Sequence, residues 1–314
     1  MGLSGHDVER FEASRPRLQA IAYRMLGSAS EAEDAVQETF LRWQGADVDR
    51  VEVPEAWLTK VLTNLCLNQL TSARARRETY VGEWLPEPLL AGDPLLGPAE
   101  TVEQRESVSF AVLAMMERLP AGERAVYVLR EAFDYPHREI GAILDISESA
   151  SQQILHRAKK HVAEGKARVE LDEGAARRVV EEFLAAAISG DTQPLVRLLT
   201  ADVVSSADGG GKIPARTKAF SGAPAVAKFL RGLFKPSEAK RAVVGGEPEV
   251  YAWVANGDPA VVAVLDGRVV GVMCLEVTAD GIAAVQNQVN PDKLERATAV
   301  WARSDHGKPL FTAF

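Results

Sequence analysis

The sequence predicts a multi-domain fold in which two all-α modules precede an α+β domain with a curved antiparallel sheet. Apolar residues recur at helical spacing over residues 1–79 and again over 106–168. Between them, residues 80–105 lose this periodicity and include the proline-rich run WLPEPLLAGDPLLGPAE. After residue 172, helical segments give way to β-branched runs separated by turn signals. We predict boundaries at 1–79, 80–105, 106–168, 172–296 and a tail at 297–314.

Composition limits the class of protein. The chain has 314 residues and is 46% hydrophobic, which suits two or three folded domains. The N-terminus carries no apolar secretion signal and no apolar run approaches a membrane span, so we expect a cytoplasmic protein without membrane contact. Cys66 and Cys274 lie in apolar surroundings and are expected to be buried thiols. The histidines show no metal-ligand spacing, and no metal or cofactor is expected.

The first module is expected to contain three helices. Phe11 to Leu26 forms an amphipathic helix, and Ser30 begins an S-x-x-E capping box for a helix running to Trp43. A third begins near Pro54. Its polar residues recur every four positions on the face opposite the apolar stripe, at Lys60, Asn64, Asn68 and Ser72. Such a face suits base reading or simple solvation; the basic run at 74–77 favours base reading.

The second module leads into a helix-turn-helix. Helices are expected at Val108–Leu119 and Gly122–Phe133, followed by two short helices within residues 134–162. Ser147 is the expected N-cap of the last helix. Its exposed polar face is predicted to contain Ser149, Ser151, Gln152, Gln153, His156, Arg157, Lys159 and Lys160. This face is typical of a helix that reads DNA, although an ordinary antiparallel helix pair fits the same spacing.

The C-terminal region is expected to be α+β. Helices are predicted at Glu173–Ser189, Thr192–Leu199 and around Ala223–Phe234. Strands are predicted in the segments RAVVGG, EVYAWVA, AVVAVLDG, RVVGVMCLEVTADG and IAAVQNQV. A sheet curved in this way could enclose a pocket for a small ligand of unknown identity.

The net charge of −8 argues against DNA binding by bulk electrostatics, because non-specific affinity comes from Lys and Arg on phosphates. Binding would have to be local or assisted by a partner. Two basic clusters, at 74–77 and 157–166, end predicted helices. Cations at helix C-termini also favour the helix dipole without any nucleic acid, so that alternative stays open.

With these motifs laid out, the N-terminal half resembles an extracytoplasmic-function (ECF) RNA polymerase sigma factor. Residues 29–44, ASEAEDAVQETFLRWQ, resemble the core-binding helix of sigma region two, which implies contacts with the polymerase clamp from Asp34, Gln37, Glu38 and Leu41. Residues 55–78 resemble the part that recognises and melts the minus-ten promoter element. The positions that would meet DNA there are Asn64, Asn68, Ser72, Arg74 and Arg77.

The second module is similar to sigma region four, whose last helix reads the minus-thirty-five element while the module binds the polymerase flap. The resemblance assigns DNA contacts to Ser149, Ser151, Gln152, Gln153, His156, Arg157 and Lys160. Family members often carry a Gly-Thr-Val-Lys-like run where this chain has Ser149-Ala150-Ser151-Gln152. Glutamine can bond bidentately to adenine, so an altered base preference is predicted.

The C-terminal region resembles the SnoaL-like branch of the nuclear-transport-factor-like superfamily, which is found fused to one group of these sigma factors. The segments that carry this resemblance are WLPEPL, DGGGK and NPDKL. It implies regulation in cis through interdomain contacts of Trp84, Pro86, Asp208, Gly209, Lys212, Asn290 and Pro291. The glycines of DGGGK could equally serve a tight turn, and Asn290-Pro291 could simply end a strand.

Two other functions compete with that of a sigma factor. A one-component helix-turn-helix regulator with a ligand-sensing C-terminal domain explains the motif and the pocket, but leaves residues 29–78 without a role. An enzyme is not expected, because the carboxylates Asp202, Asp208, Asp266 and Glu276 form no legible acid-base constellation.

Overall fold

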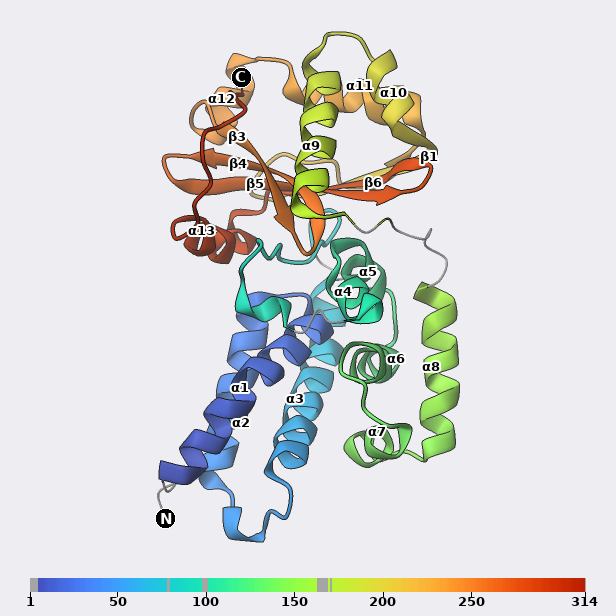
Figure 1. Ribbon diagram of the computed structural model, residues 1–314, viewed down its shortest axis with the longest axis vertical. Helices are drawn as coiled ribbons and strands as arrows, with labels where there is room; N and C mark the ends of the chain where they lie inside the picture. The colour runs from blue at the N-terminus through green and yellow to red at the C-terminus, as the bar shows by residue number, and fades with distance from the viewer. Residues whose placement is uncertain (1–4, 78–79, 98–100, 163–168, 170, 314) are drawn as a thin grey trace. The chain divides into compact units, whose positions relative to one another are not determined.

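The computed structural model describes residues 5–77, 80–97, 101–162, 169 and 171–313, and the side chains of 73–77 and 102 lie outside the description. The chain forms two compact units. The first contains Met1–Glu78 and Pro94–Glu164, and the second contains Thr79–Asp93 and Gly165–Phe314. Figure 1 shows an all-helical first unit and a second unit built on a sheet.

The first three helices of unit one pack through their apolar faces. They are α1 (Gly5–Leu26), α2 (Ala29–Gly45) and α3 (Pro54–Arg77), with a short 3-10 turn, η1 (Val48–Arg50), before α3. Leu58 and Leu62 of α3 are fully buried, as the predicted apolar stripe requires. The predicted capping box at Ser30 is wrong, because the N-cap lies two residues earlier in the chain. Ser28 is the N-cap of α2, and its hydroxyl accepts a hydrogen bond from the Glu31 N–H at 3.2 Å.

The next elements of unit one are η2 (Pro94–Leu96), α4 (Val102–Val108), α5 (Phe110–Met116), α6 (Ala121–Tyr127) and a π-helical turn, η3 (Val128–Ala132). Of the two helices predicted here, the one at 108–119 is shorter in the structure, whereas the one at 122–133 is present as α6 with the π-helical turn that follows it. Helix α4 lies partly in the predicted linker. Ser109 separates α4 from α5 because it adopts a non-helical conformation and caps α5. Its hydroxyl accepts from the Val112 N–H at 3.2 Å, the local competition that makes serine a helix boundary.

The helix-turn-helix is present. Its helices are α7 (His137–Leu144) and α8 (Glu148–Val162). Asp145 turns the chain in a left-handed conformation with φ 55°, and the Ser147 hydroxyl caps α8 by accepting from the Ala150 N–H at 3.1 Å. Gly141 lets the turn approach α7, because a Cβ there would lie 2.6 Å from the Ile146 carbonyl oxygen.

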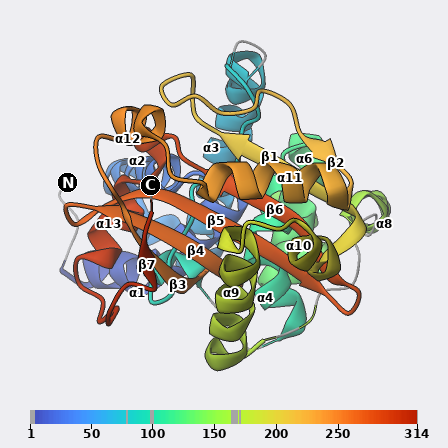
Figure 2. The same cartoon turned by 90° about the horizontal axis from the view of Figure 1, so that it is seen from above.

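Unit two is an α+β domain with a seven-stranded, mostly antiparallel sheet of order β2-β1-β6-β5-β4-β3-β7. Its strands are β1 (Leu199–Asp208), β2 (Phe220–Ser221), β3 (Glu249–Ala255), β4 (Asp258–Leu265), β5 (Arg268–Thr278), β6 (Gly281–Gln288) and β7 (Phe311–Thr312). The helices are α9 (Glu173–Ile188), α10 (Gln193–Leu198), α11 (Ala223–Phe234), α12 (Glu238–Val244), the 3-10 turn η4 (Pro291–Lys293) and α13 (Glu295–Trp301). Figure 2 shows α9 and α11 crossing the sheet. Their apolar faces and the inner face of the sheet form the core.

Two predictions in this domain are wrong. The segment RAVVGG forms the end of α12 rather than a strand, and Gly245 stops that helix in a left-handed conformation. Strand β1 was not predicted, and it pairs in parallel with β6, so the sheet is mixed rather than wholly antiparallel. Both errors have the same cause: whether a segment forms a strand depends on its packing against neighbouring strands, which its own residue types do not reveal.

The tail packs on unit two through Trp301. This side chain is buried and meets the rings of Tyr251 and Trp253 at centroid distances of 4.8 and 5.2 Å. His306 stacks on Trp301 with centroids 4.3 Å apart. The segment after α13 then returns as β7 to pair with β3.

Cys66 and Cys274 are buried and are not joined in a disulfide, as expected. Burial raises the pKa of the Cys66 thiol. None of the helices within the described ranges is long and apolar enough to cross a membrane.

Candidate nucleic-acid interface and strap cradle

One face of α2 is exposed and mixes polar residues with a large apolar one. Asp34, Gln37 and Leu41 are exposed and Glu38 is half-buried, at the three- and four-residue spacing that places them on one helical face. Leu41 is 52% exposed, although most leucines of this unit are buried. An apolar anchor among polar residues is the composition expected of a protein-binding surface.

The predicted base-reading face of α3 is only partly open. Asn68 and Ser72 are exposed and Asn64 is half-buried, while the side chains of Arg74 and Arg77 lie outside the described residues. Lys60 belongs to this face by spacing but bonds to the helix-turn-helix. Its ammonium donates to the Asp145 carboxylate at 2.7 Å and to the Ala142 carbonyl at 2.8 Å.

Two buried arginines hold the N-terminal helices to those of the second module. Arg24 of α1 donates to the Ser107 hydroxyl at 2.9 Å, and Arg124 of α6 donates to the Met25 carbonyl at 2.7 Å and the Glu117 carboxylate at 2.7 Å. Burial lowers the pKa of Arg24 to about 10 and that of Arg124 to about 9. The two helical modules therefore form one packed unit, with desolvated guanidinium groups at their junction.

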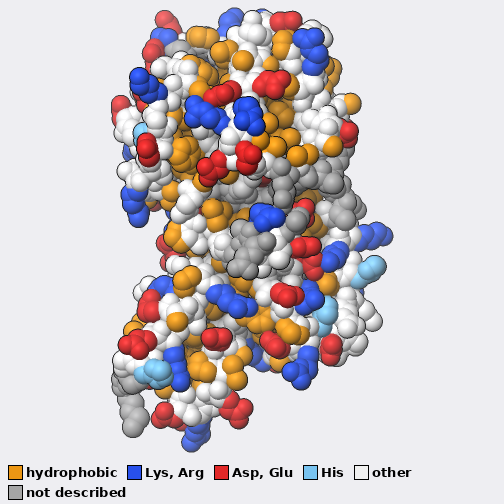
Figure 3. All heavy atoms as spheres, in the orientation of Figure 1, with side chains coloured by type: hydrophobic (Ala, Val, Ile, Leu, Met, Phe, Trp, Pro, Cys, Tyr) orange, Lys and Arg blue, Asp and Glu red, His pale blue; other side chains and the backbone are white. Residues whose placement is uncertain are grey.

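The outer face of α8 has the chemistry of a DNA-reading helix. The exposed side chains on it are Ser149, Gln152, Gln153, His156, Arg157, Lys159 and Lys160. Figure 3 shows basic and histidine side chains gathered along the edge that α8 forms. Cations suit phosphates and glutamine amides suit base edges, so both kinds of contact are available on one helix.

The predicted exposure of Ser151 is wrong. Its side chain is fully buried, and its hydroxyl lies 2.9 Å from His137 Nδ1 on α7. The packed face of α8 includes positions 151 and 158, whose spacing of seven residues repeats on one side of a helix. Ser151 therefore joins the two helices of the motif instead of facing outward.

Two acids of the α6–η3 segment orient the basic side of α8. Glu123 is mostly buried and accepts from Arg157 at 3.2 Å and from His161 at 3.0 Å. Lys159 pairs with Glu131 at 2.7 Å. Arg157 stays 55% exposed, so this pairing fixes its position without removing it from solvent.

Residues 80–93, here called the strap, belong to unit two although they connect helices of unit one. The strap follows the edge of β3, where Leu90 forms an isolated antiparallel bridge with Ala255. Asn256 bonds the main chain of Leu89 from both sides, donating its N–H to the Leu89 carbonyl at 2.8 Å and accepting the Leu89 N–H on its side chain at 2.9 Å. The proline-rich segment is therefore bound along its length rather than free.

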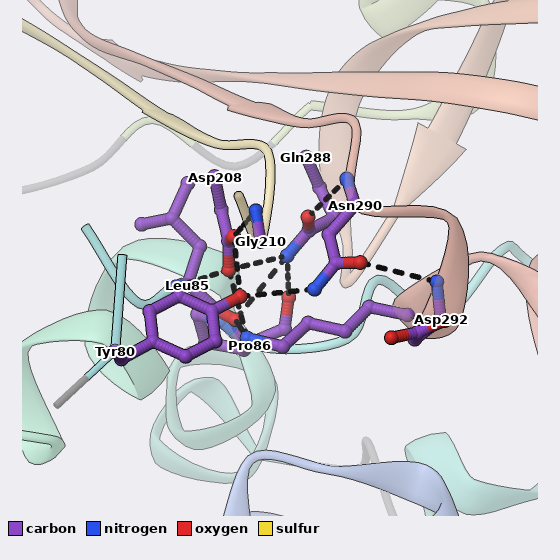
Figure 4. A network of polar contacts seen from close by, with 9 residues as sticks. Tyr80, Leu85, Pro86, Asp208, Gly210, Gln288, Asn290 and Asp292 are labelled. Atoms are coloured by element: carbon purple, nitrogen blue, oxygen red, sulfur yellow. Dashed lines mark hydrogen bonds and ion pairs between the residues drawn. The ribbon is translucent and has the colours of Figure 1, made fainter. Parts of the chain in front are cut away.

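The other half of the strap lies in a cradle of four side chains. Figure 4 labels three of them, Asp208, Gln288 and Asn290, and the fourth is Lys293. The Asp208 carboxylate is fully buried and accepts the Leu85 N–H at 3.0 Å. The Lys293 ammonium donates to Asp208 at 2.8 Å and to the Leu85 carbonyl at 2.7 Å. The Gln288 amide donates to the carbonyls of Leu85 and Pro86 at 3.2 and 3.1 Å. These side chains therefore form hydrogen bonds with the extended main chain in the way that a neighbouring strand would.

Tyr80 closes one end of the cradle. Its hydroxyl donates to Asp208 at 2.6 Å and accepts from the Asn290 amide at 2.9 Å. Burial and the hydrogen bond to Asp208 raise the pKa of Tyr80. Gly210 lies against Asn290 with φ 61°, and a Cβ there would approach the Asn290 amide nitrogen to 2.3 Å. This glycine of DGGGK therefore serves the turn and the cradle at once.

The structure separates the predicted regulatory residues into two groups. In the first group, Trp84 and Pro86 belong to the strap, and Asp208 and Asn290 belong to the cradle that binds it. The Lys293 ammonium lies 3.8 Å from the Trp84 ring centroid. The second group lies outside these contacts. Gly209 forms the turn after β1, Pro291 begins η4, and Lys212 pairs with Asp292 at 2.6 Å on the surface.

Sequence reasoning missed Tyr80, Gln288 and Lys293 as cradle residues. Lys293 lies within the NPDKL segment itself, and Gln288 precedes that segment by two residues, so proximity to the marker was the available signal.

Comparison with known proteins matches these features. Residues 10–76 match the family model of sigma-70 region 2, and residues 109–162 match sigma-70 region 4. The chain is 37% identical over 297 residues to the ECF RNA polymerase sigma factor SigJ of Mycobacterium tuberculosis, covering 91% of this chain and 93% of the relative. It is 31% identical over 303 residues to the probable ECF sigma factor SigI of the same species, covering 93% and 97%.

A solved structure covers all three parts of the chain. The crystal structure of M. tuberculosis SigJ is similar with a TM-score of 0.70 and 33% identity, and the match covers 91% of this chain and 97% of that one. The order of the helical modules and the α+β domain is therefore shared along nearly the whole length. This chain belongs to the extracytoplasmic-function RNA polymerase sigma factors.

Proposed function

We propose that this sigma factor directs promoter-specific initiation under the control of its own C-terminal domain, which acts by holding the strap. The observation that carries the proposal is the capture of the strap main chain by Asp208, Gln288 and Lys293. The exposed face of α2 with Leu41 is the proposed contact with the core polymerase clamp. The second module is proposed to bind the flap.

The proposed promoter contacts are divided between two helices. Helix α3 would meet the minus-ten element through Asn64, Asn68, Ser72, Arg74 and Arg77. Helix α8 would read the minus-thirty-five element through Ser149, Gln152, Gln153, His156, Arg157 and Lys160. Capture of unpaired bases by amides and cations on α3 would help keep the melted element open.

The packed modules do not suit simultaneous reading of both elements. The names of the elements place them about 25 nucleotides apart, or roughly 85 Å of duplex at 3.4 Å per base pair. Helix α3 is only about 36 Å long at 1.5 Å per residue, and Lys60 joins it directly to the turn beside α7. We infer that the modules must separate before both can bind one promoter.

The strap is the covalent connection across which that separation must occur. A free chain from Arg77 to Thr101 could extend to roughly 80 Å. Docking of residues 80–93 on unit two fixes the middle of this connection in one conformation, because it is held by hydrogen bonds and by the Asp93–Arg296 ion pair at 2.6 Å. Strap docking therefore favours the closed arrangement of the modules, and its release favours the open one.

In vitro transcription with bacterial core polymerase tests the proposal. The double variant Asp208→Leu with Lys293→Met removes the strap-holding charges together, so no buried charge is left alone. We expect it to initiate from the cognate promoter at least several-fold more than the native chain. Asp292→Asn, which alters only the exposed pair with Lys212, is the matched control and should behave like the native chain.

Equal initiation by the double variant and the native chain would contradict control through the strap. Failure of the native chain to bind core or direct initiation would overturn the assignment of the α2, α3 and α8 surfaces. A duplex-binding assay without polymerase would then test the one-component regulator.

A further inference from the structure

Unit two contains a cavity of about 560 Å³ on the side of the sheet that faces the helices. Its wall is mostly apolar and comes from α11, α12 and the strands β3 to β5. Representative lining side chains are Phe229, Leu233, Val243, Val250, Val261 and Met273. The volume lies within the range of pockets that hold small organic molecules.

Charge in the cavity has one sign. Among the residues that the structure describes, the charged ones in its lining are Arg216 and Lys240, and none of the lining residues is a carboxylate. The Lys240 ammonium is bound to carbonyls at the end of α11, including that of Leu233 at 3.0 Å. Arg216 stacks over the Phe220 ring at 4.1 Å and has no acidic partner within the described part of the chain. An apolar body carrying one anionic group is the ligand chemistry that complements this lining.

The cavity and the strap cradle use opposite faces of the same two strands. β1 and β6 are paired in parallel, with Ala207 opposite Asn287 and Asp208 opposite Gln288. The first pair lines the cavity, whereas the second binds the strap. The alternation continues past β6, where Val289 lines the cavity and Asn290 bonds Tyr80. Successive residues of a strand point to opposite faces of the sheet. Each of these cavity-lining residues is therefore followed directly in the chain by a cradle residue.

The loop after β1 also belongs to both sites. Ile213, Pro214 and Arg216 line the cavity. The same loop begins at Gly209, and the N–H of its second residue, Gly210, donates to Asp208 at 3.0 Å. The Gly209 carbonyl accepts the Ile213 N–H at 3.0 Å. This hydrogen bond joins the start of the loop to the part of the loop that lines the cavity. A ligand that orders residues 213–216 would therefore also order the turn that positions the Asp208 carboxylate.

We propose that this cavity binds a small apolar acid and that its occupancy tightens the docking of the strap through β1, β6 and the 209–217 loop. The two sites are coupled through conformational entropy. A ligand that orders the 209–217 loop lowers the entropy cost of docking the strap, because the loop contributes to both sites. The proposal deepens the proposed control of initiation and rests on it for its consequence in transcription. The binding and the coupling are tested without transcription.

Binding is tested on the full-length chain by isothermal titration with dodecanoate, and with dodecan-1-ol as the uncharged probe. Arg216→Gln should weaken dodecanoate binding about tenfold and alter dodecan-1-ol binding less than twofold, because a charge-assisted contact contributes only to the acid. Arg268→Gln changes an exposed arginine that does not line the cavity and should leave both affinities unchanged. Ala263→Phe fills the cavity and should weaken both probes at least tenfold, with Ala279→Phe in the exposed β5–β6 turn as its control.

Coupling is tested by hydrogen exchange of peptides from the strap, residues 80–93. Saturating dodecanoate should slow exchange there severalfold in the native chain and leave it unchanged in Ala263→Phe. Absence of dodecanoate binding, or equal loss of both probes in Arg216→Gln, overturns the site. Binding with unchanged or faster strap exchange overturns the coupling. Slowed exchange without any change in initiation supports this inference and contradicts control through the strap instead.

Discussion

The junction of the two helical modules and the cradle of the strap are both built around buried charges, yet they hold different kinds of partner. At the module junction, Arg24 and Arg124 bond to groups of helices that have their own apolar cores. At the cradle, Asp208 and Lys293 hold an extended segment that has one β-bridge and no helix of its own. Folded helices keep their structure when one polar contact is lost, whereas an extended segment depends on each contact. The strap is therefore expected to be more sensitive than the module junction to the loss of polar contacts.

The largest effect on this comparison should come from Asp208→Ala. The substitution leaves the Lys293 ammonium, whose side chain is 10% exposed, without the Asp208 carboxylate. Removing one partner of a buried ion pair costs about 3–5 kcal/mol, so the free energy of unfolding of unit two should fall by that amount. Urea unfolding followed by far-ultraviolet circular dichroism measures it. Asp292→Ala should change it by less than about 1 kcal/mol, as expected for an exposed pair; an equal loss in both variants would contradict the special role of the cradle.

Arg124→Met should have the next largest effect, on unit one alone. It removes hydrogen bonds to the Met25 and Met116 carbonyls and the Glu117 carboxylate. We expect a loss of about 2–4 kcal/mol, because the contributions of hydrogen bonds made by one side chain are not additive and methionine retains part of the packing. Hydrogen exchange should speed up in α1 and α6 and stay unchanged in the strap. The exposed Arg118→Met is the control, and a matching change there would remove the distinction between the two sites.

The third test concerns the difference between a base-reading contact and a phosphate contact on α8. Gln152→Ala with Gln153→Ala should reduce discrimination at adenine positions of the minus-thirty-five element by about 1–3 kcal/mol per lost bidentate contact. Lys160→Ala should weaken binding to all promoter sequences alike and lower the salt dependence by about one phosphate. Quantitative initiation from a promoter library at several salt concentrations separates these outcomes. Unchanged promoter preference in the double variant would refute base reading by these glutamines.

The smallest effect is expected at the exposed Lys60–Asp145 pair, whose side chains are 40% and 76% exposed. A double-mutant cycle with Lys60→Gln and Asp145→Asn should give a coupling energy of about 0.2–1 kcal/mol, because solvent screens the pair. Asparagine tolerates the left-handed conformation at position 145, so the turn should remain intact. A coupling energy above about 2 kcal/mol would show that this pair, and not the buried arginines, holds the modules together.

The helices and the helix-turn-helix could be predicted from the sequence because their signals are local. Apolar spacing, the Ser147 cap and the turn before it act over a few residues, and the structure confirms them. The overall fold class, two helical modules and an α+β domain, follows from the same signals. The resemblance to ECF sigma factors was likewise carried by contiguous segments, and the relatives confirm it.

Other features depended on groups distant in sequence. The burial of Ser151 depends on His137 in another helix, and the engagement of Lys60 depends on Asp145 in another module. The parallel pairing of β1 with β6 depends on a strand that lies more than seventy residues later. A local sequence pattern cannot identify such partners. Secondary-structure propensity depends on the residue and its near neighbours in the chain, and not on the distant residues that pack against it.

The strap shows this division most clearly. By itself the sequence determined that the helical pattern breaks after α3 and that three short segments mark the chain, because prolines and glycines restrict the backbone locally. The predicted end of the break at residue 105 is wrong, since α4 already begins at Val102. Only the tertiary structure decided that the segment is bound and not free, and that Asp208, Gln288 and Lys293 bind it. The N–H and carbonyl groups of the extended strap need hydrogen-bond partners once they are buried. Those partners lie on and after strands that begin more than a hundred residues later in the chain, so only folding of the sheet brings them close.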